Sequence, residues 1–363
     1  MKKNVVLYSA VCAAMLASCA GEKQESAVEP QADPIAWTDT VKFENNLRGG
    51  LQGYDVKGYN AAGQLALIES YDVKDGKAAC ATTTIYQNGK PVYAKDWDET
   101  GAKVVGTDVW KYDDKGNVTE EVQSQFITEK QKIEPVTKYT YSYDANGNLT
   151  SIVEAGYANL RYTDAYEWTY AYDDKGRLTD RKDYTFDGNT RKQANWYTFK
   201  YNDKDQLVEK DYYYYDLKTN KLRHDAKTEY TYNDAGQELT STLIRHKNNQ
   251  KRDPINSRLY TKEYNADGQI TYDGEQRWNS HLNNEKGGWD TSTHSTSFKY
   301  DAQGRQIEKT EIVQTNKGLR MVSEITAYGA PADKVKPTPA TPGSSVKPVV
   351  NLQDKNKTSK EED

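Results

Sequence analysis

The chain has 363 residues, of which 28 % are charged, and its formal net charge is −5 at pH 7. A mixed-sign surface without a basic patch gives no reason to expect a nucleic-acid partner. Tyrosine occurs 29 times and phenylalanine five times. Because tyrosine joins a large ring to a hydroxyl group that tolerates water, a sheet built from it is expected to be wet over much of its surface.

The first 18 residues have the pattern of a signal peptide. Lys2 and Lys3 supply a positive start, and the mostly apolar run from 4 to 16 is too short to cross a bilayer as a stable helix. The sequence LASC at 16–19, which ends in Cys19, resembles the cleavage box of bacterial lipoproteins. The resemblance implies cleavage before Cys19 and lipidation of its thiol. An ordinary secretory signal with a chance cysteine is the alternative.

The residues after Cys19 bear on the location of the protein. Ala20 stands where an inner-membrane retention aspartate would be, so the same resemblance implies a lipid anchor in the outer membrane. Glu22 and Glu25 are similar to export signals of some surface-exposed lipoproteins, and both a surface-exposed and a periplasm-facing orientation stay open. Residues 19–36 are predicted to be a flexible tether.

The cysteines exclude an intrachain disulfide in the mature protein. With the processing that the lipoprotein resemblance implies, Cys12 lies in the removed segment and Cys19 carries the lipid, which leaves Cys80 alone. We expect Cys80 to be a half-buried strand residue rather than a nucleophile, and its pairing between chains stays open.

Closely spaced turn signals mark residues 37–110. They include Gly63, Asp75-Gly76 and Asn88-Gly89, and Asp-Gly and Asn-Gly are strong hairpin signals. We predict shorter hairpins in this part, with strands of about five to eight residues.

An eight-residue phrase organises residues 111–328. Its clearest copy, YDANGNLT, begins at Tyr143, and Tyr139 and Tyr141 precede it in the alternation of a half-buried strand. The Asp-x-x-Gly that follows predicts a type I turn with a bulge. Further copies begin at Tyr59, Tyr112, Tyr172, Tyr201, Tyr232, Tyr264 and Tyr300. A repeat of about thirty residues holds two strands and two turns, and such units must stack on their neighbours to bury a face.

The predicted fold is therefore all-β: an antiparallel β-hairpin repeat meander that forms an elongated or curled sheet. Residues 37–328 are predicted to be one such domain, and an open sheet, a spiral and a barrel remain alternatives. Residues 329–363 are rich in Pro, Lys and Glu and are predicted to be a disordered tail.

The Tyr-Asp-x-x-Gly-Asn/Arg-Leu-Thr phrase resembles the YD (RHS-type) repeat of bacterial cell-surface and toxin-delivery proteins. There the repeats wind a long antiparallel sheet into a hollow shell. Here the steps are longer than the usual repeat, and a polar tail stands where a terminal core and toxin would follow. The resemblance implies a short YD-like envelope lipoprotein rather than a toxin-encapsulating protein.

The sequence contains no recognisable catalytic motif, and we expect neither a cofactor nor a metal. Asp144, Asn146 and Asn148 have the spacing of an EF-hand loop, but Leu149 stands at the place of its glycine and Ala155 at that of its last ligand. We therefore predict a protein that is not an enzyme.

Two groups of aromatic residues are candidates for binding. Trp278 and Trp289 flank Gly287-Gly288 in the longest repeat, where rings can stack on sugars or anchor a protein. Tyr213 and Tyr215 share one face of a run of four tyrosines. The alternative for both groups is ordinary sheet surface.

The first functional hypothesis is an outer-membrane-anchored, non-catalytic binding or scaffold module at the cell envelope, with a glycan or a protein as ligand. The alternatives are an envelope polysaccharide or peptidoglycan hydrolase and a periplasm-facing structural partner of an envelope complex. Converging carboxylates in a deep cleft would favour the hydrolase, and a shallow aromatic face the binding module.

Overall fold

The structure, a computed structural model, describes residues 29–44, 50–247, 251–279, 282, 287–290, 294–315 and 318–327. The predicted signal peptide (1–18), the lipidation site Cys19 and the predicted tail (329–363) lie outside the described residues, as does the tether up to residue 28. No helix among the described residues is long and apolar enough to cross a membrane.

Antiparallel strands make up the fold, which confirms the all-β prediction. The strands are β1 (Trp37–Glu44), β2 (Leu51–Tyr59), β3 (Leu65–Lys74), β4 (Lys77–Gln87), β5 (Lys90–Trp97), β6 (Val104–Tyr112), β7 (Val118–Ile127), β8 (Lys132–Tyr143), β9 (Leu149–Ala158), β10 (Arg161–Tyr172), β11 (Leu178–Asp187), β12 (Thr190–Tyr201), β13 (Leu207–Asp216), β14 (Lys221–Tyr232), β15 (Glu238–Lys247), β16 (Lys251–Tyr264), β17 (Ile270–Asn279), β18 (Gly288–Trp289), β19 (His294–Tyr300), β20 (Gln306–Thr315) and β21 (Gly318–Ala327).

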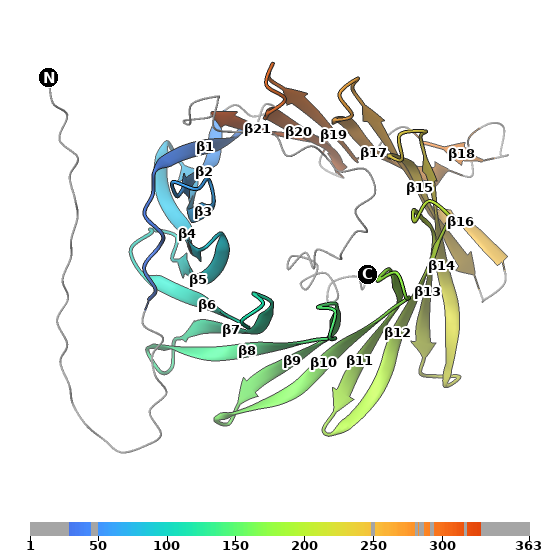
Figure 1. The fold of residues 1–363 in the computed structure, drawn as a ribbon, viewed down its shortest axis with the longest axis horizontal. Helices are drawn as coiled ribbons and strands as arrows, with labels where there is room; N and C mark the ends of the chain where they lie inside the picture. Colours follow the sequence, from blue (N-terminus) through green and yellow to red (C-terminus); the bar gives the residue numbers. More distant parts are fainter. Residues whose placement is uncertain are drawn as a thin grey trace, which may run out of the picture.

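The meander closes into a barrel. Consecutive strands pair, β17 pairs with β19, and β1 pairs with β21 through Thr40–Glu44 and Ser323–Ala327 (Figure 1). Among the described residues, the short strand β18 pairs only with the end of β17. Of the alternatives that the sequence left open, the structure therefore has the barrel.

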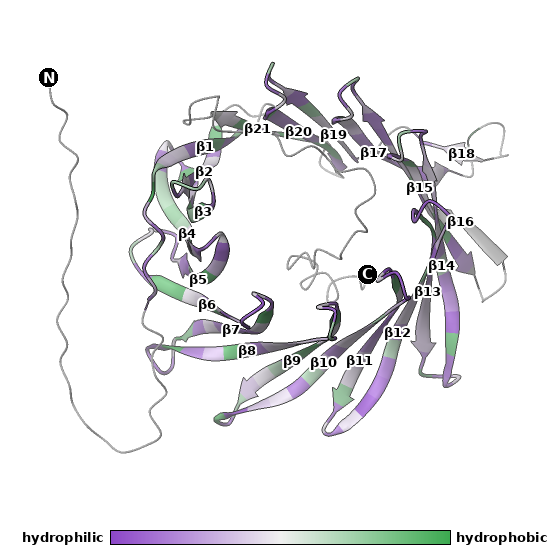
Figure 2. Ribbon diagram, in the orientation of Figure 1, coloured by the Kyte–Doolittle hydropathy of each residue, from purple (hydrophilic) through white to green (hydrophobic). Residues whose placement is uncertain are grey.

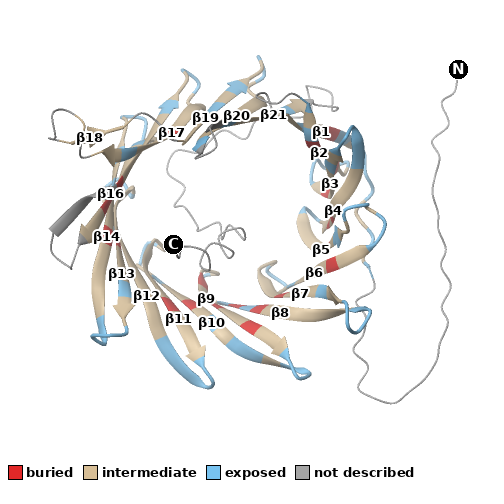
Figure 3. Ribbon diagram, turned by 180° about the vertical axis from the view of Figure 1, so that it is seen from behind, coloured by how far each residue is buried: buried red, intermediate tan, exposed pale blue. Residues whose placement is uncertain are grey.

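Paired residues on neighbouring strands point to the same side of a sheet, so the strand register divides the barrel wall into two faces. Tyr139, Tyr141, Trp168, Tyr197 and Tyr212 lie on one of them, which we call the tyrosine face. Hydrophilic residues run along all the strands in Figure 2, and Figure 3 shows buried residues only as short patches. Over the described residues, the wall is thus one sheet thick and has no continuous dry core.

Each copy of the phrase forms a turn that its first polar residue organises. At Asp144 the Oδ1 atom accepts hydrogen bonds from the backbone N–H groups of Asn146 and Asn148, at 2.9 and 2.8 Å. Gly147 takes a φ of 81°, which glycine adopts without steric cost. The strand register shifts at Tyr143, as expected for the predicted bulge.

The chemistry of the first turn residue matches that of the residue four positions on. A carboxylate only accepts hydrogen bonds and needs a donor, whereas an Asn amide can donate to the oxygen of a Gln. Asp pairs with Asn or Arg in Asp113–Asn117, Asp144–Asn148, Asp173–Arg177 and Asp301–Arg305. Asn pairs with Gln in Asn60–Gln64, Asn202–Gln206, Asn233–Gln237 and Asn265–Gln269.

From Tyr112 onward, the tyrosine that begins each phrase ties its repeat to the one before. The hydroxyl of Tyr172 donates to the carbonyl oxygen of Leu149, the first residue of β9, at 2.8 Å. The same contact, at 2.6 to 2.9 Å, joins Tyr112 to Pro91, Tyr143 to Val118, Tyr201 to Leu178, Tyr232 to Leu207, Tyr264 to Glu238 and Tyr300 to Ile270. We call this series the tyrosine ladder.

The prediction of short strands before residue 110 was wrong for most of them. Strands β2, β3, β4 and β6 have 9, 10, 11 and 9 residues, and only β1 and β5 have 8. The turns at Asp75-Gly76 and Asn88-Gly89 contain two residues each, all with positive φ, so the strands take up nearly all of the interval between turns. Cys80 is half-buried in β4, as predicted.

Candidate functional site

The structure brings Trp278 and Trp289 together. They are paired across β17 and β18, and their rings meet edge to face with centroids 5.3 Å apart. Gly287 fits closely, because a Cβ atom there would lie 2.6 Å from Trp278 Cζ2. Both tryptophans are half-buried, and a side-chain contact from Asn279 Nδ2 to Asp290 Oδ2 at 3.1 Å supports the pair.

Tyr213 belongs to a row of rings on the face opposite the tyrosine face. The rings of Trp196, Tyr213, His224 and His246 follow one another with centroid distances of 5.0, 4.8 and 4.4 Å. Rings stacked in this way cover one another's faces and present their edges to the surroundings. The Tyr215 hydroxyl instead donates to Asn220 Oδ1 at 2.5 Å, and Tyr215 takes no part in the row.

Charged groups flank this ring row. Glu209 forms ion pairs with Lys200 and Lys227. Burial alone would raise the pKa of Glu209, but the two lysines outweigh it and lower the pKa to about 2. Burial, together with the neighbouring His224 ring, lowers the pKa of His246, so His246 favours its neutral form.

A groove lies between the tips of the hairpins β9–β10 and β11–β12, and it has a volume of about 390 Å³. We call it the tip groove. Strands β10 and β11 pair only from Tyr166 and Thr185 onward, so the two hairpins separate beyond that point. A bulge between Asp164 and Tyr166 lies at this point of β10, and bulges bend and twist a strand.

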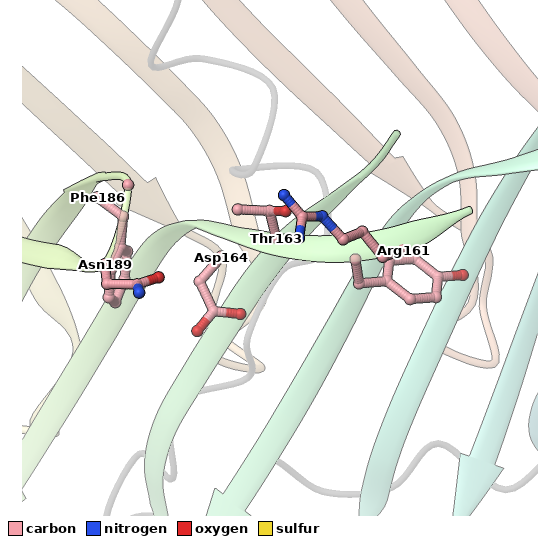
Figure 4. A pocket seen from close by; sticks show the side chains of 7 residues that line it. Arg161, Thr163, Asp164, Phe186 and Asn189 are labelled. Carbon is pink, nitrogen blue, oxygen red and sulfur yellow. The ribbon is translucent and has the colours of Figure 1, made fainter. Parts of the chain in front are cut away.

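Polar side chains face the tip groove from both hairpins. Figure 4 shows Arg161, Thr163 and Asp164 on one side, and Phe186 and Asn189 on the other. Among the described residues, no hydrogen-bond or ion-pair partner is found for the side chains of four of these residues, Arg161, Thr163, Asp164 and Asn189. The groove therefore presents a cation, a carboxylate, a hydroxyl and an amide beside an aromatic ring.

Tight turns hold the walls of the tip groove. The β9–β10 turn contains Asn159 and Leu160 with φ values of 52° and 62°, and Gly188 takes 58° in the β11–β12 turn. Leu160 is 83 % exposed, so it adopts a left-handed conformation that is costly for a branched residue without any gain from burial. Each wall of the groove therefore ends in a two-residue turn.

A second cavity, of about 330 Å³, lies on the tyrosine face between β12 and β15. We call it the tyrosine pocket. The rings of Tyr197 and Tyr212 stack at 4.9 Å, and the Tyr212 hydroxyl donates to Asn195 Oδ1 at 2.9 Å. Arg181 lies 5.1 Å from the centroid of the Tyr197 ring. Burial raises the pKa of both tyrosines.

The predicted aromatic residues line neither cavity. The tip groove has one carboxylate in its lining, Asp164, and the tyrosine pocket has none. The groove-lining residues escaped prediction because their placement depends on the bulge near Ala165, which has no glycine to mark it. The first four residues of β10, Arg161-Tyr-Thr-Asp, begin and end with a charged residue, and this is the one sequence signal that could have indicated the site.

Fold and cavities together define a closed antiparallel barrel of hairpin repeats with small polar cavities in its wall. No family model matches the chain. No curated protein matches it.

Among solved structures, the chain is similar to a protein of unknown function from Bacteroides fragilis, with 13 % identity over 35 % of this chain and 89 % of that one and a TM-score of 0.28. It is similar to the Tc holotoxin pore of Photorhabdus luminescens, with 13 % identity over 74 % of this chain and 15 % of that one and a TM-score of 0.37. A porin-like protein from Bacteroides uniformis shares 11 % identity over 82 % of this chain and 98 % of that one, at a TM-score of 0.31. At this level the likeness says nothing about function.

Proposed function

We propose that the protein is a non-catalytic binding module of the cell envelope that holds a glycan in the tip groove. The observation that carries the proposal is the set of four partnerless polar side chains beside Phe186. Sugar hydroxyls both donate and accept hydrogen bonds, and they match a lining that offers a guanidinium, a carboxylate, an amide and a hydroxyl. The Phe186 ring supplies an apolar surface for the C–H face of a sugar.

The position of the groove supports this proposal. Binding residues concentrate on loops that a rigid scaffold holds, and here two short turns and the paired parts of four strands hold them. Arg161, Thr163, Asp164 and Asn189 are exposed, so a large ligand such as a polysaccharide reaches them without a conformational change.

The envelope location is supported by the sequence and is compatible with the fold. We propose that Cys19 carries the lipid and that the outer membrane holds the protein, as its LASC box implies. Charged residues stand on both faces of the barrel wall, for example Arg181 on the tyrosine face and Lys182 on the other. A wall of this kind suits an aqueous surrounding on both sides.

A glycan array with the purified full chain tests the proposal. Arg161→Ala should weaken binding at least about tenfold, because a charge-assisted hydrogen bond contributes about 1.5–3 kcal/mol. Lys218→Ala, at the exposed tip of the neighbouring β13–β14 hairpin, is the matched control and should bind as the wild type does. Absence of any glycan signal, or equal binding by Arg161→Ala and wild type, would overturn the proposal.

A further inference from the structure

The tyrosine pocket exists because a small residue stands among large ones. Ala226 is paired with Tyr212 on β13 and with Arg245 on β15, and only 3 % of it is exposed. Beside this row, Lys210, Thr228 and Leu243 are paired across the same three strands. A larger side chain at Ala226 would fill the hollow.

The lining of the tyrosine pocket combines hydrogen-bond donors with apolar walls. Lys210, Arg245 and Thr228 line it together with the rings of Tyr197 and Tyr212, and no carboxylate does. Because burial raises the pKa of Tyr197, its hydroxyl stays protonated and remains a donor at physiological pH. Lysine and arginine side chains donate only, so the pocket favours a ligand that accepts hydrogen bonds.

The two cationic side chains that line the pocket each contact a neighbouring side chain. Arg245 forms an ion pair with Asp225 through Nη1, and a guanidinium with five N–H groups keeps donors for a second acceptor. Lys210 Nζ lies 5.3 Å from the centroid of the Tyr197 ring, which places its charge over the pocket wall. This arrangement is pre-organised, and binding then needs little reordering.

We propose that the tyrosine pocket is a second binding site, separate from the tip groove, and that it takes a single acidic sugar unit. The carboxylate lies against Lys210 and Arg245, and the ring lies against Leu243 and the tyrosines. The volume of about 330 Å³ is near the lower end of small-molecule sites, about 300–1,000 Å³, and suits one ring rather than a long chain. A free uronic acid and a terminal uronic acid of a polysaccharide share this chemistry.

Isothermal titration of the full chain with D-glucuronic acid tests the inference, with D-glucose as the matched ligand that lacks the carboxylate. Glucuronate should bind at least about tenfold more tightly than glucose, and more weakly at high salt. A glucuronate-terminated oligosaccharide distinguishes the two sources, because tighter binding than the monomer indicates a polysaccharide end.

Three variants complete the test. Lys210→Gln should lower the affinity for glucuronate about tenfold, while the melting temperature falls by no more than about 4 °C. Lys218→Ala, which lies in neither cavity, should leave the affinity unchanged. Lys210→Gln should have the same effect in an Arg161→Ala background, in which the tip groove no longer binds, so the two sites succeed or fail separately. The inference is overturned if glucose binds as well as glucuronate, if Lys210→Gln has no effect, or if neither sugar binds at about 1 mM.

Discussion

The tyrosine ladder is expected to hold neighbouring repeats together, and Tyr172→Phe tests it by removing one hydroxyl and no other atom. In the wild type this hydroxyl donates to Leu149 O at 2.8 Å. Burial raises the pKa of Tyr172 to about 12, so the donor is present throughout the physiological range. The Leu149 residue is only 6 % exposed, and water replaces the lost partner poorly.

The expected loss follows from that burial. An average hydrogen bond contributes about 1 kcal/mol net, and a buried acceptor left alone costs about 1–3 kcal/mol. We expect the free energy of unfolding to fall by about 1–2 kcal/mol, and the melting temperature to fall by about 2–4 °C per kcal/mol. Urea unfolding followed by circular dichroism measures the first quantity, and a thermal scan the second.

Tyr166→Phe is the matched control for this experiment. Tyr166 is 46 % exposed, and its hydroxyl has no hydrogen-bond partner among the described residues, so its removal should change the stability by less than about 0.5 kcal/mol. Equal losses in the two variants, or none in Tyr172→Phe, would refute a stabilising role for the ladder.

Three further predictions concern a turn, a charge and a close contact. Gly147→Val should destabilise the protein by about 1–2 kcal/mol, because φ is 81° there, whereas Gly156→Ala, with open space around its Cβ position, should be nearly neutral; equal effects in urea unfolding would contradict the turn assignment. Glu209 has a folded-state pKa of about 2 against 4.5, so its contribution is present above pH 4.5 and is lost as the pH falls toward 2. Glu209→Gln should accordingly flatten the fall of the melting temperature in that window, and an unchanged profile would show that the ion pairs do not contribute. Gly287→Ala would place a Cβ atom 2.6 Å from Trp278 and should shift tryptophan fluorescence and near-UV circular dichroism; an unaltered spectrum would mean that the pair adapts.

The repeat phrase predicted the turns and strands within each repeat well. It did not predict which strands distant in the sequence pair with one another. Asp144 and Gly147 predict their turn because each satisfies a local requirement of the backbone. Asp144 accepts hydrogen bonds from backbone N–H groups up to four positions away, and Gly147 takes a positive φ. The pairing of β1 with β21 joins segments about 280 residues apart, and neither segment carries a local sign of its partner.

The candidate sites could not be predicted from the sequence either, because they too depend on how strands lie beside one another. Tyr213 was expected on an aromatic surface because alternation places it on one face, but ring stacking depends on Trp196 and His224 of other strands. The tip groove depends on where the pairing of β10 with β11 stops. Trp278 and Trp289 differ from these sites. They lie close together in the sequence, and the pairing of β17 with β18 in the same segment brings their rings together.

Closure between β1 and β21 also bears on solubility. A sheet edge exposes a row of unpaired N–H and C=O groups that templates pairing with another chain, and a closed barrel avoids this hazard. In this barrel, the pairing of Thr40–Glu44 with Ser323–Ala327 removes two edges at once. Loss of β1 by proteolysis would uncover β2 and β21 together, and the opened barrel would have two sheet edges that can pair with other chains.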